Sequence, residues 1–384
     1  MHLIQSLNSD PGKDRIAMAI TDTDVNSKIQ EEKVEEKVRE NEEQAILRVE
    51  NLHTSFFTDS GEVRAVNGVS FNLPKGKVLG VVGESGSGKS VTAYSIMQIL
   101  ADTGRVVEGK ILYKGENILD YSEKKMNSFR GEKCSIIFQD PMTSLNPTFT
   151  IGWQLREAIQ LHTDYKTKEE ANKRAVELLK MVGITEPERR MKQYPFEYSG
   201  GMRQRVMIAM ALACEPDILI ADEPTTALDV TIQAQILELM KELQKEMGMA
   251  IILVTHDLGV IASMCDEIIV MYGGRVCERG TADDIFYRPC HEYTKGLLRS
   301  IPDVKNMKEK LVPIGGSPIN MLSLPKGCAF CPRCEKALKV CLENAPDEME
   351  MPDGHYASCW LNVKKEYEEE INAENQKMAG KEHA

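Results

Sequence analysis

Apolar residues fall into short runs along this chain, and these runs predict the strands of a sheet. Nearly uninterrupted apolar runs occupy residues 78–82, 218–221 and 250–254. Runs of this length without polar alternation are typical of strands that are buried on both faces, as in a parallel sheet. Segments with a helical spacing of apolar positions lie between them, so the pattern predicts an α/β protein.

Two regions depart from this alternation of strands and helices. Residues 47–52, 63–66 and 69–73 are short and partly alternating, which predicts a small antiparallel sheet ahead of the first buried strand. Residues from about 145 to 215 repeat apolar positions at helical spacing and predict an inserted helical subdomain. The expected fold class is therefore α/β, with a parallel core sheet, an antiparallel β subdomain and a helical insertion.

The two ends of the chain are rich in charge. Residues 28–40 interleave glutamate with lysine and offer little apolar surface, so we expect a flexible N-terminal arm over residues 1–45. A helix that docks on a partner is the alternative interpretation of this arm. The remaining domain predictions are a main domain over 46–290, a C-terminal extension over 291–362 and a charged tail over 363–384.

The overall charge and hydropathy restrict the class of protein. The 384 residues have a formal net charge of −12, which argues against nucleic acid as the main partner. No apolar run approaches the roughly 20 residues that cross a bilayer, and the first residues lack the pattern of a secretory signal. We therefore expect a cytosolic protein whose membrane role, if it has one, depends on partners.

A phosphate-binding loop is the strongest motif in the sequence. Residues 83–90 read Gly-Glu-Ser-Gly-Ser-Gly-Lys-Ser, directly after the buried strand and before a helical run. Glycines let backbone N–H groups turn toward phosphates, and the start of the helix adds the positive end of its dipole. Lys89 supplies a point charge, and the Ser90 hydroxyl is expected to bind Mg²⁺.

Polar residues follow two other buried strands. Asp222 and Glu223 end one strand, and they fit a carboxylate on the Mg²⁺ side and a base that polarises the attacking water. His256 follows the next strand and fits a contact to the γ-phosphate. The plain alternatives are two surface acids and a structural histidine.

A second helix start is suited to an anion. Ser199 fits the cap of a helix, and the N–H groups of Gly200 and Gly201 are free to meet a phosphate. Because the loop at 83–90 already accounts for one nucleotide, this second start indicates a site that two subunits share. An aromatic at Phe56 or Phe57 fits stacking on an adenine ring.

Half of the ten cysteines lie close together near the C-terminus. Thiols at Cys328, Cys331, Cys334, Cys341 and Cys359 are enough for zinc or an iron–sulfur cluster, each of which takes four ligands. The other cysteines stand among apolar neighbours and are expected to be small core residues: Cys134, Cys214, Cys265, Cys277 and Cys290.

With these motifs in this order, residues 46–360 resemble the nucleotide-binding subunits of ATP-binding cassette (ABC) transporters. The resemblance implies a P-loop ABC ATPase that uses ATP and Mg²⁺. It assigns nucleotide contacts to Phe56, Gly83, Ser85, Gly86, Gly88, Lys89, Ser90, Val91, Gln139, Ser199, Gly200, Gly201, Gln204, Asp222 and Asp229. It assigns catalytic roles to Glu223, His256 and Gln139, and the Mg²⁺ contacts to Ser90, Gln139 and Asp222. Residues 226–229 look like the D-loop of the family.

Finer features are similar to the branch of this family that imports peptides or nickel. Residues 138–147 and 201–212 look like that branch, and Met202 is similar to its D-type subunit. In this branch four cysteines of the extension can hold a [4Fe–4S] cluster, which here implies Cys328, Cys334, Cys341 and Cys359, with Cys331 as an alternative ligand. Zinc, or no metal, are the alternatives.

The resemblance also implies partners. These are a second ABC ATPase of the F type, two membrane permeases and an extracytoplasmic peptide-binding protein, with this subunit at the cytoplasmic face of the membrane. Nickel import by the same family is one alternative function. A non-transport ABC ATPase that acts on ribosomes or DNA is the other.

Overall fold

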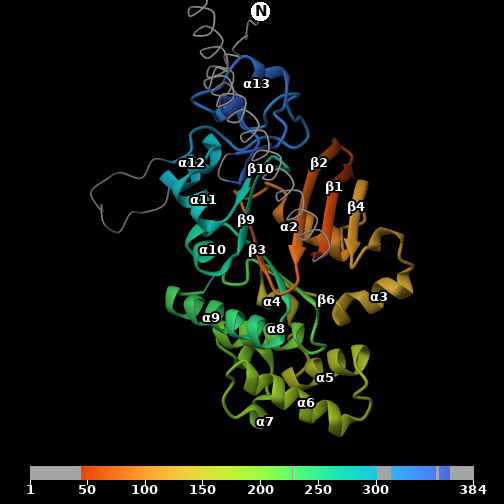
Figure 1. Ribbon diagram of the computed structural model, residues 1–384. Helices are drawn as coiled ribbons and strands as arrows, with labels where there is room; N and C mark the ends of the chain where they lie inside the picture. Colours follow the sequence, from red (N-terminus) through yellow and green to blue (C-terminus); the bar gives the residue numbers. More distant parts are fainter. Residues whose placement is uncertain (1–44, 227, 301–312, 352–353, 364–384) are drawn as a thin grey trace, which may run out of the picture. The chain divides into compact units, whose positions relative to one another are not determined.

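The computed structural model describes residues 45–226, 228–300, 313–351 and 354–363 (Figure 1). The predicted arm over 1–45 lies outside these residues except for Ala45, and the predicted tail lies outside them except for Val363. The account below concerns the unit Ile46–Ala384.

An eight-stranded sheet forms the centre of the fold, in the order β11-β12-β10-β9-β3-β8-β7-β6. Its parallel strands are β6 (Cys134–Ile137), β7 (Ile218–Asp222), β8 (Ala250–Thr255), β3 (Val78–Val82) and β9 (Glu267–Tyr272). Its antiparallel strands are β10 (Arg275–Gly280), β12 (Tyr356–Ala357) and β11 (Met349–Glu350).

The expected parallel sheet is thus confirmed for five strands, but the sheet as a whole is mixed. The reversal comes from the two residues between β9 and β10. Gly273 and Gly274 have φ of 58° and 76°. Two successive positive φ angles form the tight hairpin turn whose twist matches the strands, and glycine adopts them at no steric cost.

A second, antiparallel sheet has the order β2-β1-β4-β5, which confirms the predicted β subdomain. Its strands are β1 (Ala45–Thr58), β2 (Gly61–Pro74), β4 (Gly104–Tyr113) and β5 (Glu116–Asn117). Helix α2 (Lys89–Met97) contacts both β4 of this sheet and β7 of the central sheet. The helix that follows the phosphate-binding loop is therefore held between the two sheets.

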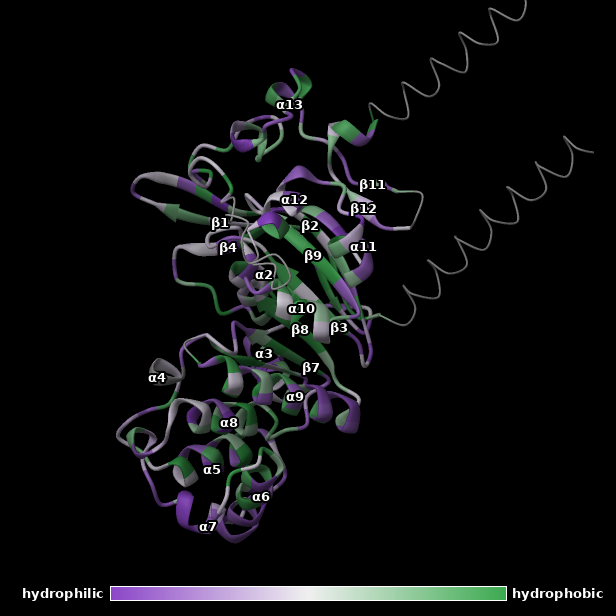
Figure 2. Cartoon of the chain, turned by 90° about the vertical axis from the view of Figure 1, so that its left-hand side faces the viewer, coloured by the Kyte–Doolittle hydropathy of each residue, from purple (hydrophilic) through white to green (hydrophobic). Residues whose placement is uncertain are grey.

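Two apolar cores lie on the two faces of the central sheet. Along β3, Leu79 and Val81 belong to the core shared with the antiparallel sheet, whereas Val78 and Val82 belong to the core shared with the helices. This alternation follows from the two-residue period of a strand. Figure 2 shows the apolar colouring concentrated on the central strands.

Helices account for most of the region between β6 and β7. They are α4 (Pro141–Ser144), α5 (Ile151–His162), α6 (Lys168–Met181), α7 (Pro187–Arg190) and α8 (Gly200–Ala211). Thr150 and Thr167 accept backbone N–H groups at the starts of α5 and α6, and Thr167 forms a full capping box with Glu170. Figure 1 shows α5, α6 and α7 gathered together, away from the antiparallel sheet.

The remaining helices flank the sheet or belong to the extension. They are α3 (Glu123–Glu132), α9 (Val230–Met247), α10 (Leu258–Met264), α11 (Ala282–Tyr287), α12 (Glu292–Arg299) and α13 (Val340–Glu343). Within the part of the chain that the structure describes, no helix combines the length and apolarity that crossing a membrane requires. The extension joins the central sheet directly, because β12 pairs with β10.

Candidate functional site

The phosphate-binding loop connects β3 to α2 and depends on its glycines. Gly83, Gly86 and Gly88 have φ of 153°, 77° and 101°, which side chains rarely adopt. A Cβ on Gly83 would lie 2.2 Å from the Met271 carbonyl oxygen, so this position also lacks the space for one. Ser85 and Gly86 are exposed at the tip of the loop. The loop therefore presents backbone N–H groups above the start of α2.

Lys89 is buried inside this loop. Its Nζ donates to the carbonyl oxygens of Gly83 at 2.8 Å and Glu84 at 3.0 Å. Burial lowers the pKa of Lys89, and the nearby carboxylates of Glu223 and Asp222 partly offset that effect. A cation in this position is suited to a polyphosphate held by the loop.

Asp222 and Ser90 form a pair that fits a divalent cation. The Ser90 hydroxyl donates to Asp222 Oδ1 at 2.8 Å, and Asp222 is 1% exposed. Burial raises the pKa of Asp222, while the hydrogen bond from Ser90 lowers it. The buried Oδ2 atom makes no hydrogen bond of ordinary geometry to any residue that the structure describes, although the Tyr94 hydroxyl also interacts with this carboxylate and lowers its pKa. A carboxylate oxygen without a partner beside a hydroxyl is a fitting donor set for Mg²⁺.

The Glu223 carboxylate contacts three side chains, from the segments that follow β6, β7 and β8. Gln139 Nε2 donates to its Oε2 at 2.8 Å, Thr226 Oγ1 donates to the same atom at 2.9 Å, and His256 Nδ1 lies 3.1 Å from Oε1. Burial raises the pKa of Glu223, but the hydrogen bonds from His256 and Thr226 outweigh burial and leave the pKa below its ordinary range. Glu223 is thus a carboxylate at neutral pH.

The backbone of Glu223 is strained, with φ of 48°. Such angles in a residue other than glycine cost of order 1–3 kcal/mol and occur where function requires them. The structure brings Gln139, Glu223 and His256 together, because they follow three neighbouring parallel strands whose carboxyl ends lie at one edge of the sheet. The contact from Thr226 was not predicted.

The second helix start lies at α8. Ser199 is exposed and accepts the Met202 N–H at 3.3 Å, which confirms its capping geometry. Gly201 leaves room for α9, because a Cβ there would lie 2.7 Å from the Ile232 side chain. Gln204, which was expected beside Ser199 in the same site, is buried at 1% exposure and lies away from the surface.

Three further residues that were predicted to contact nucleotide make contacts within the fold. Asp229 caps α9 through a bond from the Ile232 N–H at 3.0 Å; the D-loop prediction includes Ala227, which lies outside the described residues. Val91 packs half-buried in α2. Phe56 packs against Gly104, where a Cβ would lie 2.5 Å from its ring.

Phe57, the other aromatic considered for adenine, is more exposed. It is 39% exposed, and the Arg105 guanidinium carbon lies 4.1 Å from the centre of its ring. Consecutive residues of a strand point to opposite faces, so only one of Phe56 and Phe57 faces a given ligand.

The five clustered cysteines line one small cavity, which also borders Trp360. Backbone N–H groups reach four of the sulfur atoms: Phe330 N–H to Cys328, Lys336 N–H to Cys334, Leu338 N–H to Cys341 and Leu361 N–H to Cys359. Burial raises the pKa of the Cys328 thiol, the bonds from the backbone offset that effect in part, and the resulting pKa is about 11. For Cys331, burial and the Cys341 thiol raise the pKa, and no backbone donor contributes.

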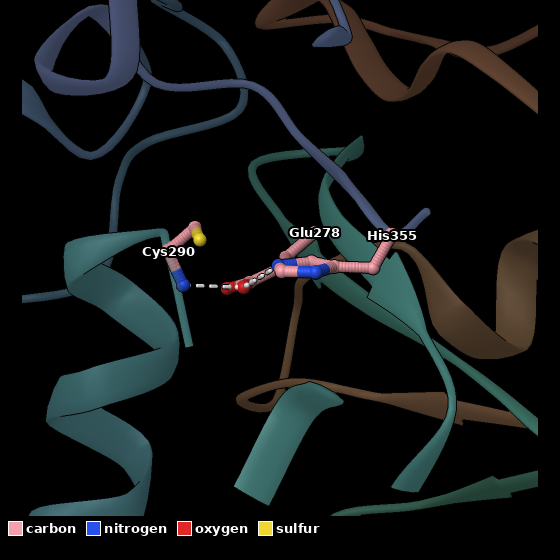
Figure 3. Close-up of side chains that lie close together, drawn as sticks. All are labelled: Glu278, Cys290 and His355. Atoms are coloured by element: carbon pink, nitrogen blue, oxygen red, sulfur yellow. Dashed lines mark hydrogen bonds and ion pairs between the residues drawn. The ribbon is translucent and has the colours of Figure 1, made fainter. Parts of the chain in front are cut away.

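A separate polar cluster was not predicted and is shown in Figure 3. Glu278 is fully buried and accepts the N–H groups of Cys290 at 2.5 Å and His291 at 3.0 Å. His355 Nε2 lies 3.4 Å from Glu278 Oε1, and its ring nitrogens make no hydrogen bond among the described residues. Ligand atoms of Glu278, Cys290 and His355 lie within 4.8 Å of one another, as a metal ion requires.

This cluster corrects one sequence prediction. Cys290 was expected to be a small core residue, but it is half-buried beside a carboxylate and an imidazole. Cys134 and Cys277, in contrast, are buried as predicted, and Cys214 and Cys265 are half-buried against the apolar core. The neighbours of Cys290 in the sequence gave no sign of this surrounding, because Glu278 and His355 lie on other elements.

Comparisons with known proteins agree with this geometry. A family model described as ABC transporter matches residues 66–226, and one described as the C-terminal region of oligopeptide/dipeptide transporters matches residues 277–341. The dipeptide transport ATP-binding protein DppD of Bacillus subtilis is 53% identical over 82% of this chain and 94% of its own length. The oligopeptide transport ATP-binding protein OppD of Salmonella typhimurium is 50% identical over 83% of this chain and 94% of its own length.

A solved structure shows the same fold. It is a dimeric, post-hydrolysis state of the ATP-binding cassette MJ0796 bound to ADP and Pi, with a TM-score of 0.55 and 30% identity. It covers 62% of this chain and 98% of that chain. The predicted fold and family are therefore confirmed, and this chain belongs to the family of ATP-binding subunits of oligopeptide and dipeptide ABC transporters.

Proposed function

We propose that this chain hydrolyses ATP as one of two ATPase subunits of an importer of di- or oligopeptides, at the cytoplasmic face of the membrane. The observation that carries the proposal is the convergence at one sheet edge of Lys89, the Ser90–Asp222 pair and the Glu223 carboxylate. The names of the relatives supply the peptide class. Nickel import by the same family remains the second candidate for cargo.

The chemistry follows from the charges at this edge. The loop N–H groups and Lys89 would bind the phosphates of ATP, and Ser90 and Asp222 would hold Mg²⁺, which screens the charge on the phosphates when it is bound. Glu223 accepts a proton from water as the water oxygen attacks the γ-phosphorus and ADP leaves. Gln139 and His256 hold the Glu223 carboxylate toward that water.

We further propose that ATP is bound between two ATPase subunits. The exposed start of α8, capped by Ser199, is suited to the γ-phosphate of the partner's nucleotide. The similar cassette MJ0796 has been solved as a dimer. Closure of the dimer on ATP would move the helices that follow Gln139, and the exposed, stacked rings of Phe149 and Trp153 offer a contact for a permease. ATP drives this change only by its greater affinity for the closed dimer.

For the cysteines we propose a [4Fe–4S] cluster on Cys328, Cys334, Cys341 and Cys359. Backbone N–H groups reach these four sulfur atoms and partly offset the burial that raises the pKa of the Cys328, Cys334 and Cys359 thiols, whereas no backbone donor contributes at Cys331. Zinc bonds to sulfur at about 2.3 Å, which would hold its thiolates roughly 3.8 Å apart. Among the described residues no three thiols have sulfur atoms within 4.8 Å of one another, which is wider than this spacing.

The first test is purification of the tagged full-length chain from its native membrane. We expect a second cassette ATPase, two permeases and a peptide-binding protein to co-purify. Uptake of labelled dipeptide and of nickel by cells with and without the chain then separates the two candidate cargoes. Recovery of ribosomes or nucleic acid without a permease would overturn the transport function and favour a non-transport ATPase.

A further inference from the structure

The phosphate-binding loop is held from the C-terminal extension. Arg333 Nη1 and Nη2 donate to the two carboxylate oxygens of Glu84, at 2.5 Å and 3.1 Å. Glu84 is the second residue of the loop, and the Arg333 side chain is only 5% exposed. A two-pronged, largely buried pair of this kind fixes both position and orientation.

Arg333 itself is fixed by the extension. Its Nε donates to the Gly315 carbonyl oxygen at 2.8 Å and its Nη2 to that of Ile314 at 3.2 Å. It ends a single turn that begins at Cys331, and Cys334 follows it directly. Arg333, which contacts the phosphate-binding loop, therefore lies in the sequence between two cysteines that line the cavity.

A second contact holds the backbone of Glu84. Its N–H donates to the Tyr293 hydroxyl oxygen at 2.8 Å. The Tyr293 ring packs with those of Tyr272 and Phe330, at centroid distances of 4.7 Å and 5.3 Å. Phe330 belongs to the extension, so both the side chain and the main chain of Glu84 depend on it.

Glu84 is connected to the phosphate site on its other side. Its carbonyl oxygen accepts a hydrogen bond from Lys89 Nζ, the cation expected to bind phosphate. Its carboxylate would also repel a polyphosphate if nothing neutralised it, because like charges a few ångströms apart in a partly buried site disfavour each other. Arg333 supplies that neutralising charge.

We propose that Arg333 is a positioning residue for the nucleotide site, through which the cysteine-rich extension sets the affinity of the loop for nucleotide. The proposal rests on the proposed function only in that the loop binds ATP. When the turn at 331–333 keeps its shape, Glu84 is paired and the loop is held for phosphate. When the cysteine cluster is lost, Arg333 withdraws and affinity falls.

The test compares two arginines that each tie the extension to the body of the protein. Arg333→Gln removes the contact to Glu84, whereas Arg279→Gln removes the two-pronged pair with Glu348, which does not touch the loop. Binding of ATP and ADP to the full-length chain is measured by calorimetry, with the melting temperature of each variant. We expect about tenfold weaker ATP binding for Arg333→Gln and less than twofold for the control, within the range typical of coupled sites.

A double variant separates charge from a general loss of structure. In Glu84→Gln the repelling carboxylate is absent, so adding Arg333→Gln should weaken binding much less than it does in the wild type. Arg333→Lys should restore part of the affinity. Equal ATP affinity for Arg333→Gln and Arg279→Gln, or full additivity with Glu84→Gln, would overturn the proposal.

A cysteine variant tests whether the cysteines affect nucleotide binding through Arg333. Cys334→Ser should weaken ATP binding in the wild type and should have no further effect in Arg333→Gln. Additive effects would show that the extension acts by another route and would refute this one. Failure of the wild-type chain to bind ATP at all would refute the proposed function instead, so the two failures are distinguishable.

Discussion

Glu223→Gln is the sharpest test of the catalytic assignment, because it removes basicity and keeps the shape of the side chain. The amide oxygen can still accept the bond from Thr226, so we expect a loss of stability of only about 1 kcal/mol. General-base catalysis contributes about 10²–10⁴-fold to a rate, or roughly 3–5 kcal/mol of barrier. The ATPase rate should fall by that factor. ATP affinity should stay within about threefold, since Lys89, Ser90 and Asp222 are untouched.

The assay is phosphate release by the assembled complex, with ATP binding measured on the same preparation. Glu238→Gln makes the same chemical change on the exposed face of α9 and serves as the control. The pH dependence adds a second check. Because the pKa of Glu223 lies below its ordinary range, its carboxylate stays charged down to acidic pH, and the ratio of wild-type to variant rates should be constant from about pH 8 to about pH 6. A variant with wild-type turnover, or rates that converge by about pH 6, would refute the assignment.

Three other predictions follow from the site. Ser199→Arg should abolish turnover of the assembled complex and leave ATP binding by the isolated chain unchanged; collapse of that binding would exclude a shared site. Phe56→Ala should weaken ATP binding by about 1–3 kcal/mol, the worth of stacking on a base, with little effect on inorganic triphosphate. Phe57→Ala is its matched control, and the reverse result would exchange the two roles. Cys334→Ser should remove iron and its visible absorbance from the purified chain, whereas Cys331→Ser should retain both; loss in both variants would change the ligand set.

Local sequence patterns predicted much of the fold, because the relevant forces act over short distances along the chain. The buried runs at 78–82, 218–221 and 250–254 became β3, β7 and β8, since an apolar run of this length has few other ways to bury both faces. The meeting of Gln139, Glu223 and His256 was predictable for a related reason. Parallel neighbours bring their carboxyl ends to one edge, so polar residues at those ends must lie close together.

The features that the sequence did not reveal depend on contacts between residues far apart in the chain, and nothing in the sequence around either residue indicates such a contact. A buried Gln204 looks the same in sequence as an exposed one, because its exposure depends on how α8 packs on its neighbours. Cys290 lies between Pro289 and His291 in the sequence, and neither indicates that Glu278 reaches it from β10. In both cases the sequence around the residue can be read directly, but it does not show which residues of another segment will pack against it.

The contact between Arg333 and Glu84 is the extreme case, since the two residues are 249 positions apart. Glu84 stands at a position that the loop pattern leaves unspecified, and Arg333 lies between two cysteines in the sequence. The packing of Phe330 on Tyr272 and Tyr293, together with the bonds from Arg333 to the extension, brings them together. An arginine that had no partner to meet would stay in water, because burying a guanidinium is costly without one. Its burial against a carboxylate of the phosphate-binding loop is therefore the observation on which the proposed link between the extension and the nucleotide site rests.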